Sequence, residues 1–594
     1  MLKKCDIKSI YKLTNGKEKC MSEKLYDIIE IHNLKDMLNK TKEMYKDKIA
    51  YKIRKKENEK EYINLTHGQV RDMIDNLGTA LIDIGLKDKR IAVIGENRYE
   101  WEIAYLAIVC GTGVVVPLDK SLPENELESL IERSEVEAIF CSEKYEEVLT
   151  KIKFNESNKL KHIISMDRTV SKDGIYSEKE LIKKGKILLE KGKKDFINAK
   201  IDSEKMSIML FTSGTTSASK VVALSHRNIC SNLMDIGSIL DITSDDTLLS
   251  ILPIHHVFEC TVGFLFSLYK GATTVFCDGL RHIVENLNEY KVSVMACVPG
   301  IYERIFMMIR KQLEKQGKLE EILEKEENLK NASMKDKKKA FQDIHNLLGG
   351  NIKLFISGAA ALDSKIEDGY RRLGFNLVQG YGLTETSPVV AVGTSKEYRC
   401  GSIGKTVPSV EAKLVDINFE GIGELAVKGP NVAMGYYNDA KATKEAFRGD
   451  WFYTGDLAKI DEDGYIFICG RKKSVIVLKN GKNIFPEEME SLVNKIEGVK
   501  ESFIFGKRQS RDTENVKINV KIVFDREIVK NAYKVETDDE IYKVLFEKIK
   551  ELNRQMPKYK AIRGMILSEK DLIKTTTNKI KRQANLDEIE KFEN

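Results

Sequence analysis

The chain has 594 residues, 42% of them hydrophobic, so it is long enough to form two or more folding units with buried cores. Lys and Arg number 97 against 91 Asp and Glu, and a net charge of +6 on this length is too weak to indicate a nucleic-acid partner. The ten cysteines form no CxxC pair, which argues against a zinc knuckle or a disulfide framework and fits a reducing cytoplasm.

The first residues of the chain contain lysines but no apolar run of signal-peptide length, so no cleaved targeting signal is expected. The most apolar stretch, residues 104–118, is interrupted by Gly111 and Gly113 and ends beside Pro117. A buried helix followed by a strand accounts for this pattern better than a membrane span does. We therefore expect no integral membrane segment.

From about residue 64 onward, amphipathic helical patterns alternate with short β-branched runs. Three such runs are IAVIG (91–95), GVVVPL (113–118) and EAIFC (137–141). This alternation predicts an α/β fold in which parallel sheets are covered by helices.

The second half of the chain changes character three times. Residues 306–345 are mostly charged helix formers and predict a solvated helical excursion between two core strands, with Lys335–Lys339 on the surface. From about 400 to 470, strands alternate with glycine turns and predict a small β subdomain. We expect residues 1–470 to form a large domain and residues 471–594 to form a smaller mixed α/β domain.

A first motif, LFTSGTTSASKVVALSH (210–226), combines an apolar strand with a loop of small hydroxyl residues. Backbone N–H groups freed by Gly214, together with the charge of Lys220, would surround phosphate oxygens. Ser219 precedes Lys220 where a Walker A loop has glycine, and a loop rich in Ser and Thr is often a plain turn, so this motif alone leaves function open. The hydroxyl groups of the motif belong to Thr212, Ser213, Thr215 and Thr216.

Two further motifs follow, QGYGLTETSP (379–388) and WFYTGDLAKIDEDGYIFICGRKKSVIVLKNGKNIFPEEME (451–490). The three motifs in this order resemble the acyl-adenylate-forming (AMP-binding) ligase superfamily, and within it the long-chain fatty acid:CoA ligases. The resemblance runs from about residue 62 to 582. It also includes LPIHHVFE (252–259), VPGIYERI (298–305), LGGNIKLFISGAAAL (348–362) and IKTTTNKIKR (573–582).

The resemblance implies how ATP is bound. The loop from Thr212 to Lys220 would hold the β and γ phosphates, Thr384 would contact the α-phosphate, and Glu385 would bind Mg²⁺. Asp456 would accept the ribose hydroxyls, with Arg471 adding a charged contact. The adenine and the adjoining wall of the nucleotide site would be formed by Gly358, Ala359, Ala360, Gln379, Gly380, Tyr381 and Gly382.

The resemblance also implies the catalytic parts. Lys579 would bridge the reacting carboxylate and the α-phosphate, and would act with Thr384 and Glu385. A mobile C-terminal domain hinged beside Lys473 would bring the region of Gly481 to CoA. His256 would line the acyl and nucleotide pocket, because HHVFE lacks the HExxH pattern of a zinc site.

The activity implied is ATP-dependent activation of a carboxylic acid, with a fatty acid of medium or long chain as substrate. A carboxylate is a poor electrophile because its leaving group would be oxide, so ATP converts that oxygen into AMP, and CoA then takes the acyl group. The substrate itself is the nucleophile, so catalysis depends on positioning and charge. Transfer to a carrier-protein thiol and a non-catalytic adenylate-binding relative remain alternatives, as does peripheral membrane contact of a cytoplasmic enzyme.

The sequence departs from the resembled family in several places. Ser217, Ser219 and Val221 stand where the phosphate loop usually has glycine, proline and glycine. A left-handed backbone at Ser217 would cost about 1 to 2 kcal/mol. Ala361, Ile573 and Asn578 replace a proline, a proline and a glycine.

Overall fold

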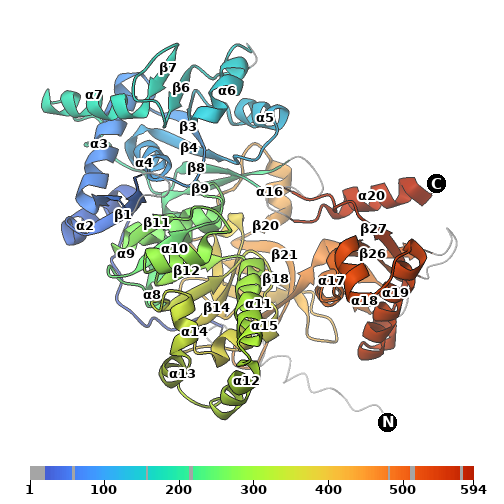
Figure 1. Cartoon of the computed structure of the whole chain (residues 1–594). Coiled ribbons are helices and arrows are strands. Elements are labelled where there is room, and N and C mark those ends of the chain that lie inside the picture. Colours follow the sequence, from blue (N-terminus) through green and yellow to red (C-terminus); the bar gives the residue numbers. More distant parts are fainter. Residues whose placement is uncertain are drawn as a thin grey trace, which may run out of the picture.

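A computed structural model describes residues 20–55, 61–155, 158–212, 219–478, 482–508, 516–575 and 579–593. Figure 1 shows a large α/β body, built from the blue to yellow part of the chain, with the orange and red C-terminal elements beside it. Two sheets covered by helices form that body, so the α/β fold class predicted from the sequence is confirmed.

The first large sheet has the strand order β19-β9-β8-β4-β3-β5-β6-β7. The strands from β8 to β7 in this order are parallel, whereas β9 and β19 are antiparallel to their neighbours. All three β-branched runs identified in the sequence are strands of this sheet. The bounds are β3 (Lys89–Ile94), β4 (Gly113–Leu118), β5 (Ala138–Cys141), β6 (His162–Ser165), β7 (Ile175–Ser177), β8 (Met206–Phe211), β9 (Val221–Ser225) and β19 (Gly435–Tyr436).

The second large sheet has the order β16-β15-β14-β13-β12-β10-β11-β1-β2. Its central strands, from β14 to β1, are parallel, and the outer strands are antiparallel. The bounds are β1 (Ile49–Arg54), β2 (Tyr62–Thr66), β10 (Thr247–Ser250), β11 (Thr273–Phe276), β12 (Val294–Cys297), β13 (Leu354–Ser357), β14 (Leu377–Gly382), β15 (Val389–Val392) and β16 (Lys405–Thr406).

The central strands read as continuous apolar runs because both of their faces are buried. In β3, Ile91 and Val93 face the core shared by the two sheets, while Ala92 and Ile94 face helices on the outer side. The helices that cover the two sheets are α2 (Leu34–Tyr45), α3 (His67–Asp83), α4 (Tyr99–Ala107), α5 (Glu124–Ser134), α6 (Glu146–Lys153), α7 (Glu178–Glu190), α8 (His226–Ile239), α9 (Phe266–Lys270), α10 (Ile283–Glu289) and α15 (Ser364–Arg372).

The apolar stretch at 104–118 forms the end of α4, a π-helical turn η1 (Ile108–Thr112) and β4, as expected for a buried helix followed by a strand. Within the described ranges, no helix is both long and apolar enough to cross a membrane. The cysteines that lie in these ranges are free thiols.

The charged excursion lies between β12 and β13 and consists of α11 (Pro299–Lys315), α12 (Leu319–Asn328), α13 (Met334–Ala340) and α14 (Gln342–Leu347). It is less solvated than the sequence suggested. Phe306, Ile309 and Leu313 form a buried stripe at helical spacing on α11. Lys337 is also buried, and its Nζ donates to the Lys330 carbonyl at 2.8 Å, so the run Lys335–Lys339 does not lie wholly on the surface.

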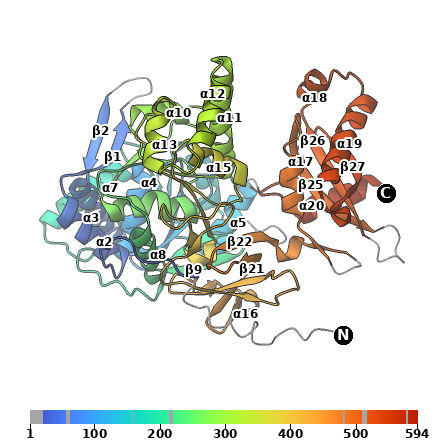
Figure 2. The ribbon, with the colours of Figure 1, turned by 90° about the horizontal axis from the view of Figure 1, so that it is seen from below.

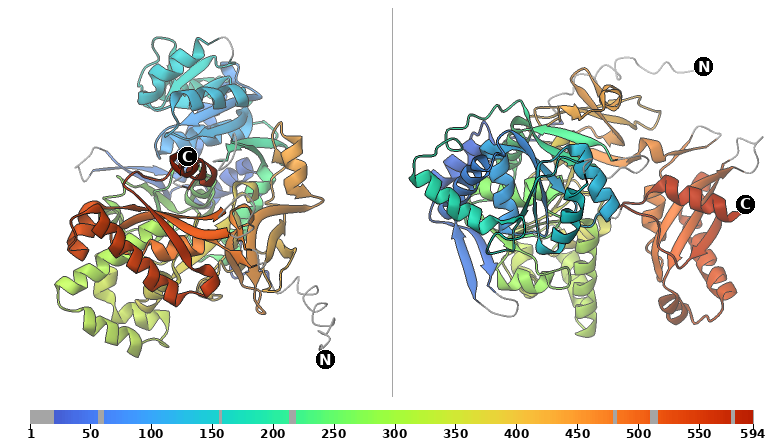
Figure 3. Two further views of the ribbon diagram at one scale, coloured as in Figure 1. Left: turned by 90° about the vertical axis from the view of Figure 1, so that its right-hand side faces the viewer. Right: turned by 90° about the horizontal axis from the view of Figure 1, so that it is seen from above.

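The glycine-rich segment forms an antiparallel sheet, as predicted for a β subdomain. Its strands are β17 (Glu411–Val415), β18 (Gly423–Lys428), β20 (Phe447–Arg448), β21 (Trp451–Ile460) and β22 (Ile466–Arg471), with α16 (Ala440–Ala446) beside them. The C-terminal elements have their own hydrophobic core and stand beside the large body in Figures 2 and 3. They are β25 (Val499–Arg508), β26 (Val516–Phe524), β27 (Ile562–Ser568), α17 (Pro486–Val493), α18 (Arg526–Tyr533), α19 (Asp538–Gln555) and α20 (Arg582–Glu593).

The core between the two large sheets predicts a large stability effect at Trp101. Its ring is fully buried and stacks on Tyr105 with a centroid separation of 5.6 Å. Trp101→Ala should lower the free energy of unfolding by about 3 to 5 kcal/mol. Phe154→Ala is the matched control, because Phe154 is 79% exposed. Urea unfolding followed by circular dichroism measures both, and equal shifts of the two midpoints would contradict this account of the core.

Candidate active site

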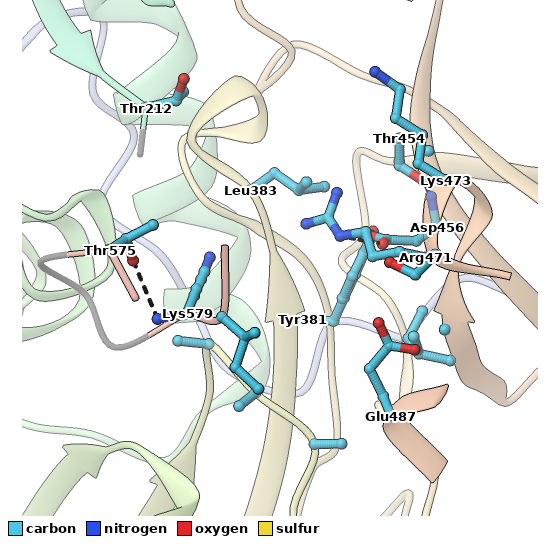
Figure 4. A pocket seen from close by; sticks show the side chains of 18 of the residues that line it. Thr212, Tyr381, Leu383, Thr454, Asp456, Arg471, Lys473, Glu487, Thr575 and Lys579 are labelled. Atoms are coloured by element: carbon cyan, nitrogen blue, oxygen red, sulfur yellow. Dashed lines mark hydrogen bonds and ion pairs between the residues drawn. The ribbon is translucent and has the colours of Figure 1, made fainter. Parts of the chain in front are cut away.

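A large cavity lies where the two large sheets, the β subdomain and the C-terminal elements meet. Several of the predicted residues line it because they follow the carboxyl ends of parallel strands. Thr212 follows β8, Gly358 follows β13, and Thr384 follows β14. In open α/β sheets, this edge is where ligands bind. Figure 4 shows Asp456, Arg471 and Tyr381 close together on one side of the pocket, with Lys579 and Thr575 on the other side.

The turn after β14 brings Thr384 and Glu385 to the cavity. Both lie in the short helical turn η4 (Thr384–Thr386), and the Ala433 N–H donates to the Glu385 carbonyl at 2.8 Å. Gly382 makes this turn possible, since a Cβ added there would lie 1.9 Å from the Pro388 carbonyl oxygen. The glycine in YGLTET is therefore required by the close approach of two backbones.

Tyr436 connects two of the predicted residues and was not identified from the sequence. Its hydroxyl donates to Glu385 Oε1 at 2.8 Å, and Lys220 Nζ lies 4.3 Å from the centroid of its ring. Lys220 and Glu385 are far apart in the chain, so only the pairing of β19 with β9 brings this tyrosine between them. No local sequence signal marks Tyr436 as a site residue.

Asp456 and Arg471 form an ion pair that is positioned by strand register. The two residues are directly opposed on β21 and β22, and Arg471 Nε lies 2.9 Å from Asp456 Oδ1. The Tyr381 hydroxyl donates to Asp456 Oδ2 at 2.6 Å. Burial raises the pKa of the Asp456 carboxyl, and the charge of Arg471 and the Tyr381 hydrogen bond oppose that rise. Each carboxylate oxygen keeps a lone pair for a further donor.

The segment after β13 forms another wall of the cavity. Ala359 and Ala360 are exposed to it, and Gly358 packs so closely on Phe258 that an added Cβ would lie 2.9 Å from the ring. The side-chain amide of Gln379 is already engaged in hydrogen bonds within this wall. Its amide accepts from the Leu362 N–H at 3.1 Å and donates to Glu367 at 2.9 Å, so it holds this wall in place.

Lys579 enters the cavity from the C-terminal elements. The loop that carries it is closed by two hydrogen bonds, from Thr575 N to the Lys579 carbonyl at 2.8 Å and from Lys579 N to Thr575 Oγ1 at 3.1 Å. Burial lowers the pKa of the Lys579 ammonium and Arg471 lowers it further, while Asp456 and Glu385 raise it. Lys579, Glu385 and the Asp456–Arg471 pair come from three distant segments and line one cavity.

His256 lies on the inner wall next to Phe258. Its Nδ1 accepts from the Phe258 N–H at 3.3 Å, so the neutral tautomer carries its proton on Nε2. Burial lowers the pKa of His256 to about 3, with the charge of Lys579 as the next cause, so the ring is neutral at physiological pH. Among the described residues, no group of three or more His, Cys, Asp or Glu side chains is placed to hold a metal ion.

The remaining predicted residues lie at the ends of described segments, on the surface, or outside the described residues. Thr212 and Lys220 are the ends of the predicted phosphate loop, and the Thr212 N–H donates to the Lys220 carbonyl at 2.9 Å. Lys473 is exposed in the turn η5 (Lys472–Ser474) that follows β22, where its role as a hinge stays a prediction. Ser213, Gly214, Thr215, Thr216 and Gly481 lie outside the described residues.

Comparison with known families identifies the class of protein. The family model described as AMP-binding enzyme matches residues 38–437, and the model of the AMP-binding enzyme C-terminal domain matches residues 473–592. The chain belongs to the AMP-binding enzyme family. The resemblance recognised from the three motifs is thereby confirmed.

Curated relatives and solved structures agree with this membership. The chain is 28% identical over 482 residues to long chain acyl-CoA synthetase 4 of Arabidopsis thaliana, covering 75% of this chain and 72% of the relative. It is 29% identical over 479 residues to human long-chain-fatty-acid–CoA ligase 1, covering 74% and 67%. ATP-bound MatB from Rhodopseudomonas palustris has a TM-score of 0.72 at 24% identity, covering 94% of this chain and 99% of that one. The anthranilate CoA ligase AuaEII in complex with anthranoyl-AMP has 0.74 at 19%, covering 95% and 98%. At these identities, the structural likeness shows a shared fold.

The backbone contact at Gly382 predicts a loss of nucleotide binding. Gly382→Ala would force its Cβ against the Pro388 carbonyl, displace the turn that carries Thr384 and Glu385, and weaken AMP binding at least about tenfold. Gly393→Ala is the control next to the paired strand β15, because its added Cβ would have its nearest contact at 3.6 Å and Gly393 does not line the cavity. Calorimetric titration with AMP measures both, and unchanged affinity in the Gly382 variant would contradict the role of this turn.

Proposed function

We propose that this chain is an ATP-dependent fatty acid:CoA ligase. It converts a fatty acid and ATP to an acyl-adenylate and pyrophosphate, and then transfers the acyl group to CoA with release of AMP. The observation that carries the proposal is the convergence of Lys579, Glu385 and the Asp456–Arg471 pair in one cavity of an AMP-binding enzyme. The relatives named as long-chain acyl-CoA synthetases support the choice of acid and acceptor.

Neither of the two chemical steps requires a nucleophile from the protein. A carboxylate oxygen of the acid attacks the α-phosphorus of ATP, and the bond to the β-phosphate oxygen breaks as pyrophosphate leaves. The CoA thiolate then attacks the acyl carbon, and AMP leaves with the oxygen that came from the acid. In the first step, the Lys579 ammonium would hold the attacking carboxylate beside the α-phosphate, where two anions must meet. Asp456 would accept the ribose hydroxyls through its remaining lone pairs.

Glu385 fits a Mg²⁺ ion that accompanies ATP. Magnesium is usually held by one or two carboxylates together with substrate phosphates and water. Tyr436 donates to Glu385 Oε1, which orients the carboxylate and leaves Oε2 without a hydrogen-bond partner among the described residues. Bound Mg²⁺ would neutralise negative charge on the phosphates of ATP.

Part of the cavity lining suits an aliphatic chain. Apolar side chains from α8 and the residue after it, from the turn η3 (Glu259–Leu265) and the two residues before it, and from β13 and β15 line the cavity and would bury hydrocarbon favourably. These side chains are Ile236, Leu240, Val257, Phe258, Val262, Ile356 and Val392. A substrate that partitions into lipid is the reason to propose a cytoplasmic enzyme with peripheral membrane contact.

Acid-dependent release of pyrophosphate from MgATP tests the function directly. The purified chain is incubated with acids from acetate to long-chain and aromatic acids, with and without CoA. Release that requires a fatty acid, followed by CoA-dependent thioester formation, is the expected result. Adenylation without thioester would indicate a carrier-protein acceptor, and no release with any acid would contradict catalysis.

Lys579 should contribute more to acyl-adenylate formation than to thioester formation. Lys579→Ala is expected to slow acyl-adenylate formation by about 100-fold or more, because one buried cation at the reacting oxygens is lost. Thioester formation from acyl-adenylate supplied ready-made should fall much less. Lys570→Ala, which removes an exposed lysine paired with Glu588, is the control. Equal losses in both half-reactions would argue against this role of Lys579.

Tyr436 should affect the requirement for magnesium. Tyr436→Phe keeps the ring beneath Lys220 but removes the hydrogen bond that orients Glu385, so the half-saturating Mg²⁺ concentration should rise about tenfold. Tyr437→Phe is the matched control, because the Tyr437 hydroxyl accepts from Arg90 instead. Magnesium titrations of pyrophosphate release at saturating ATP compare the two, and superimposable curves would remove Tyr436 from the metal site.

A further inference from the structure

The neck of the predicted phosphate loop lacks the restraint that a proline would supply. Ser219 stands where the resembled loops have proline, directly before Lys220. Proline fixes its own φ and reduces the freedom of the chain around it, whereas serine does neither. The hydrogen bond from Thr212 N to the Lys220 carbonyl closes the neck, but it does not orient the Ser219 peptide.

Arg133 contacts Ser219 from outside the loop. This residue lies in the last turn of α5, and its Nη2 donates to the Ser219 carbonyl at 2.6 Å while Nη1 donates to Ser219 Oγ at 3.3 Å. The guanidinium also lies over the ring of Phe211, 5.6 Å from its centroid. Phe211 is the last residue of β8, so one side chain contacts the segments on both sides of the loop.

Arg133 forms no ion pair with a carboxylate of the described segments. Its guanidinium instead contacts Ser219 and the Phe211 ring, and Arg133 lines the same cavity as Lys220. Lys220 rests on the ring of Tyr436 and has no ion pair with a described carboxylate either. Two cations therefore flank the end of the loop, an arrangement that favours a polyanionic ligand.

We propose that Arg133 is a positioning residue for the pyrophosphate portion of ATP. Its fork of N–H groups holds the carbonyl and hydroxyl oxygens of Ser219, and thereby holds Lys220 toward the β and γ phosphates. A planar guanidinium can make two directed hydrogen bonds and stack on an aromatic ring, which an ammonium cannot do. The inference rests on the proposed adenylate-forming function and adds a residue to it.

Loss of the Arg133 guanidinium should weaken the binding of ATP without weakening the binding of AMP. In Arg133→Gln, the KM for ATP in pyrophosphate release and the Kd for inorganic pyrophosphate should each rise about tenfold, as expected for loss of a charge-assisted hydrogen bond. The Kd for AMP and the rate of thioester formation from supplied acyl-adenylate should not change, because neither ligand has β or γ phosphates. Arg133→Lys, which keeps the charge without the fork, should recover less than half of the loss.

Arg90→Gln is the matched control. Arg90 bonds Glu135 and the Tyr437 hydroxyl and stacks on the Tyr437 ring, next to Arg133 but without contact to Ser219. Unchanged pyrophosphate affinity in Arg133→Gln, an equal loss of AMP affinity, or full recovery by Arg133→Lys would overturn the inference. The pyrophosphate titration needs no turnover, so it distinguishes failure of this inference from failure of the proposed ligase activity. Thermal unfolding of each variant checks that the fold is intact.

Discussion

Burial of the Asp456 carboxylate beside Arg471 is the interaction on which the cavity depends. A buried carboxylate is costly unless a charge and hydrogen bonds compensate it, and here Arg471 and the Tyr381 hydroxyl supply both. These contacts connect two sheets. Tyr381 belongs to β14 of the large body, whereas Asp456 and Arg471 belong to the β subdomain. Arg471 also lies at the end of β22, immediately before the chain continues to the C-terminal elements.

That position gives the ion pair a second consequence. Lys579 reaches the same cavity from the C-terminal elements, where Arg471 disfavours its charge while Asp456 and Glu385 favour it. Electrostatic interactions are stronger where the local dielectric constant is low. A bound anion would therefore strongly change the electric field at the Lys579 ammonium. The cavity is thus prepared for phosphate and carboxylate groups before either is bound.

The opposite side of the cavity is organised by aromatic rings instead of ion pairs. Tyr436 accepts the Lys220 ammonium on its face and orients Glu385 with its hydroxyl, and Phe211 accepts the Arg133 guanidinium. Rings hold these cations without neutralising them, so the charges stay available to an anionic ligand. On this side, Arg133 also donates to the Ser219 carbonyl next to Lys220.

Much of this protein was determined by local sequence. Runs such as IAVIG and GVVVPL are apolar at every position because both faces of their strands are buried, so β3 and β4 could be predicted, and the order of three motifs was enough to identify the family. Sequence and structure differ at Lys337, a charged residue whose side chain is buried. Its ammonium donates to the Lys330 carbonyl, and the local charge pattern does not reveal this contact. Tyr436 and Arg133 could not be found from the sequence for the same reason. Their partners lie 51 and 86 residues away, and only the strand pairing and helix packing of the folded chain bring them into contact.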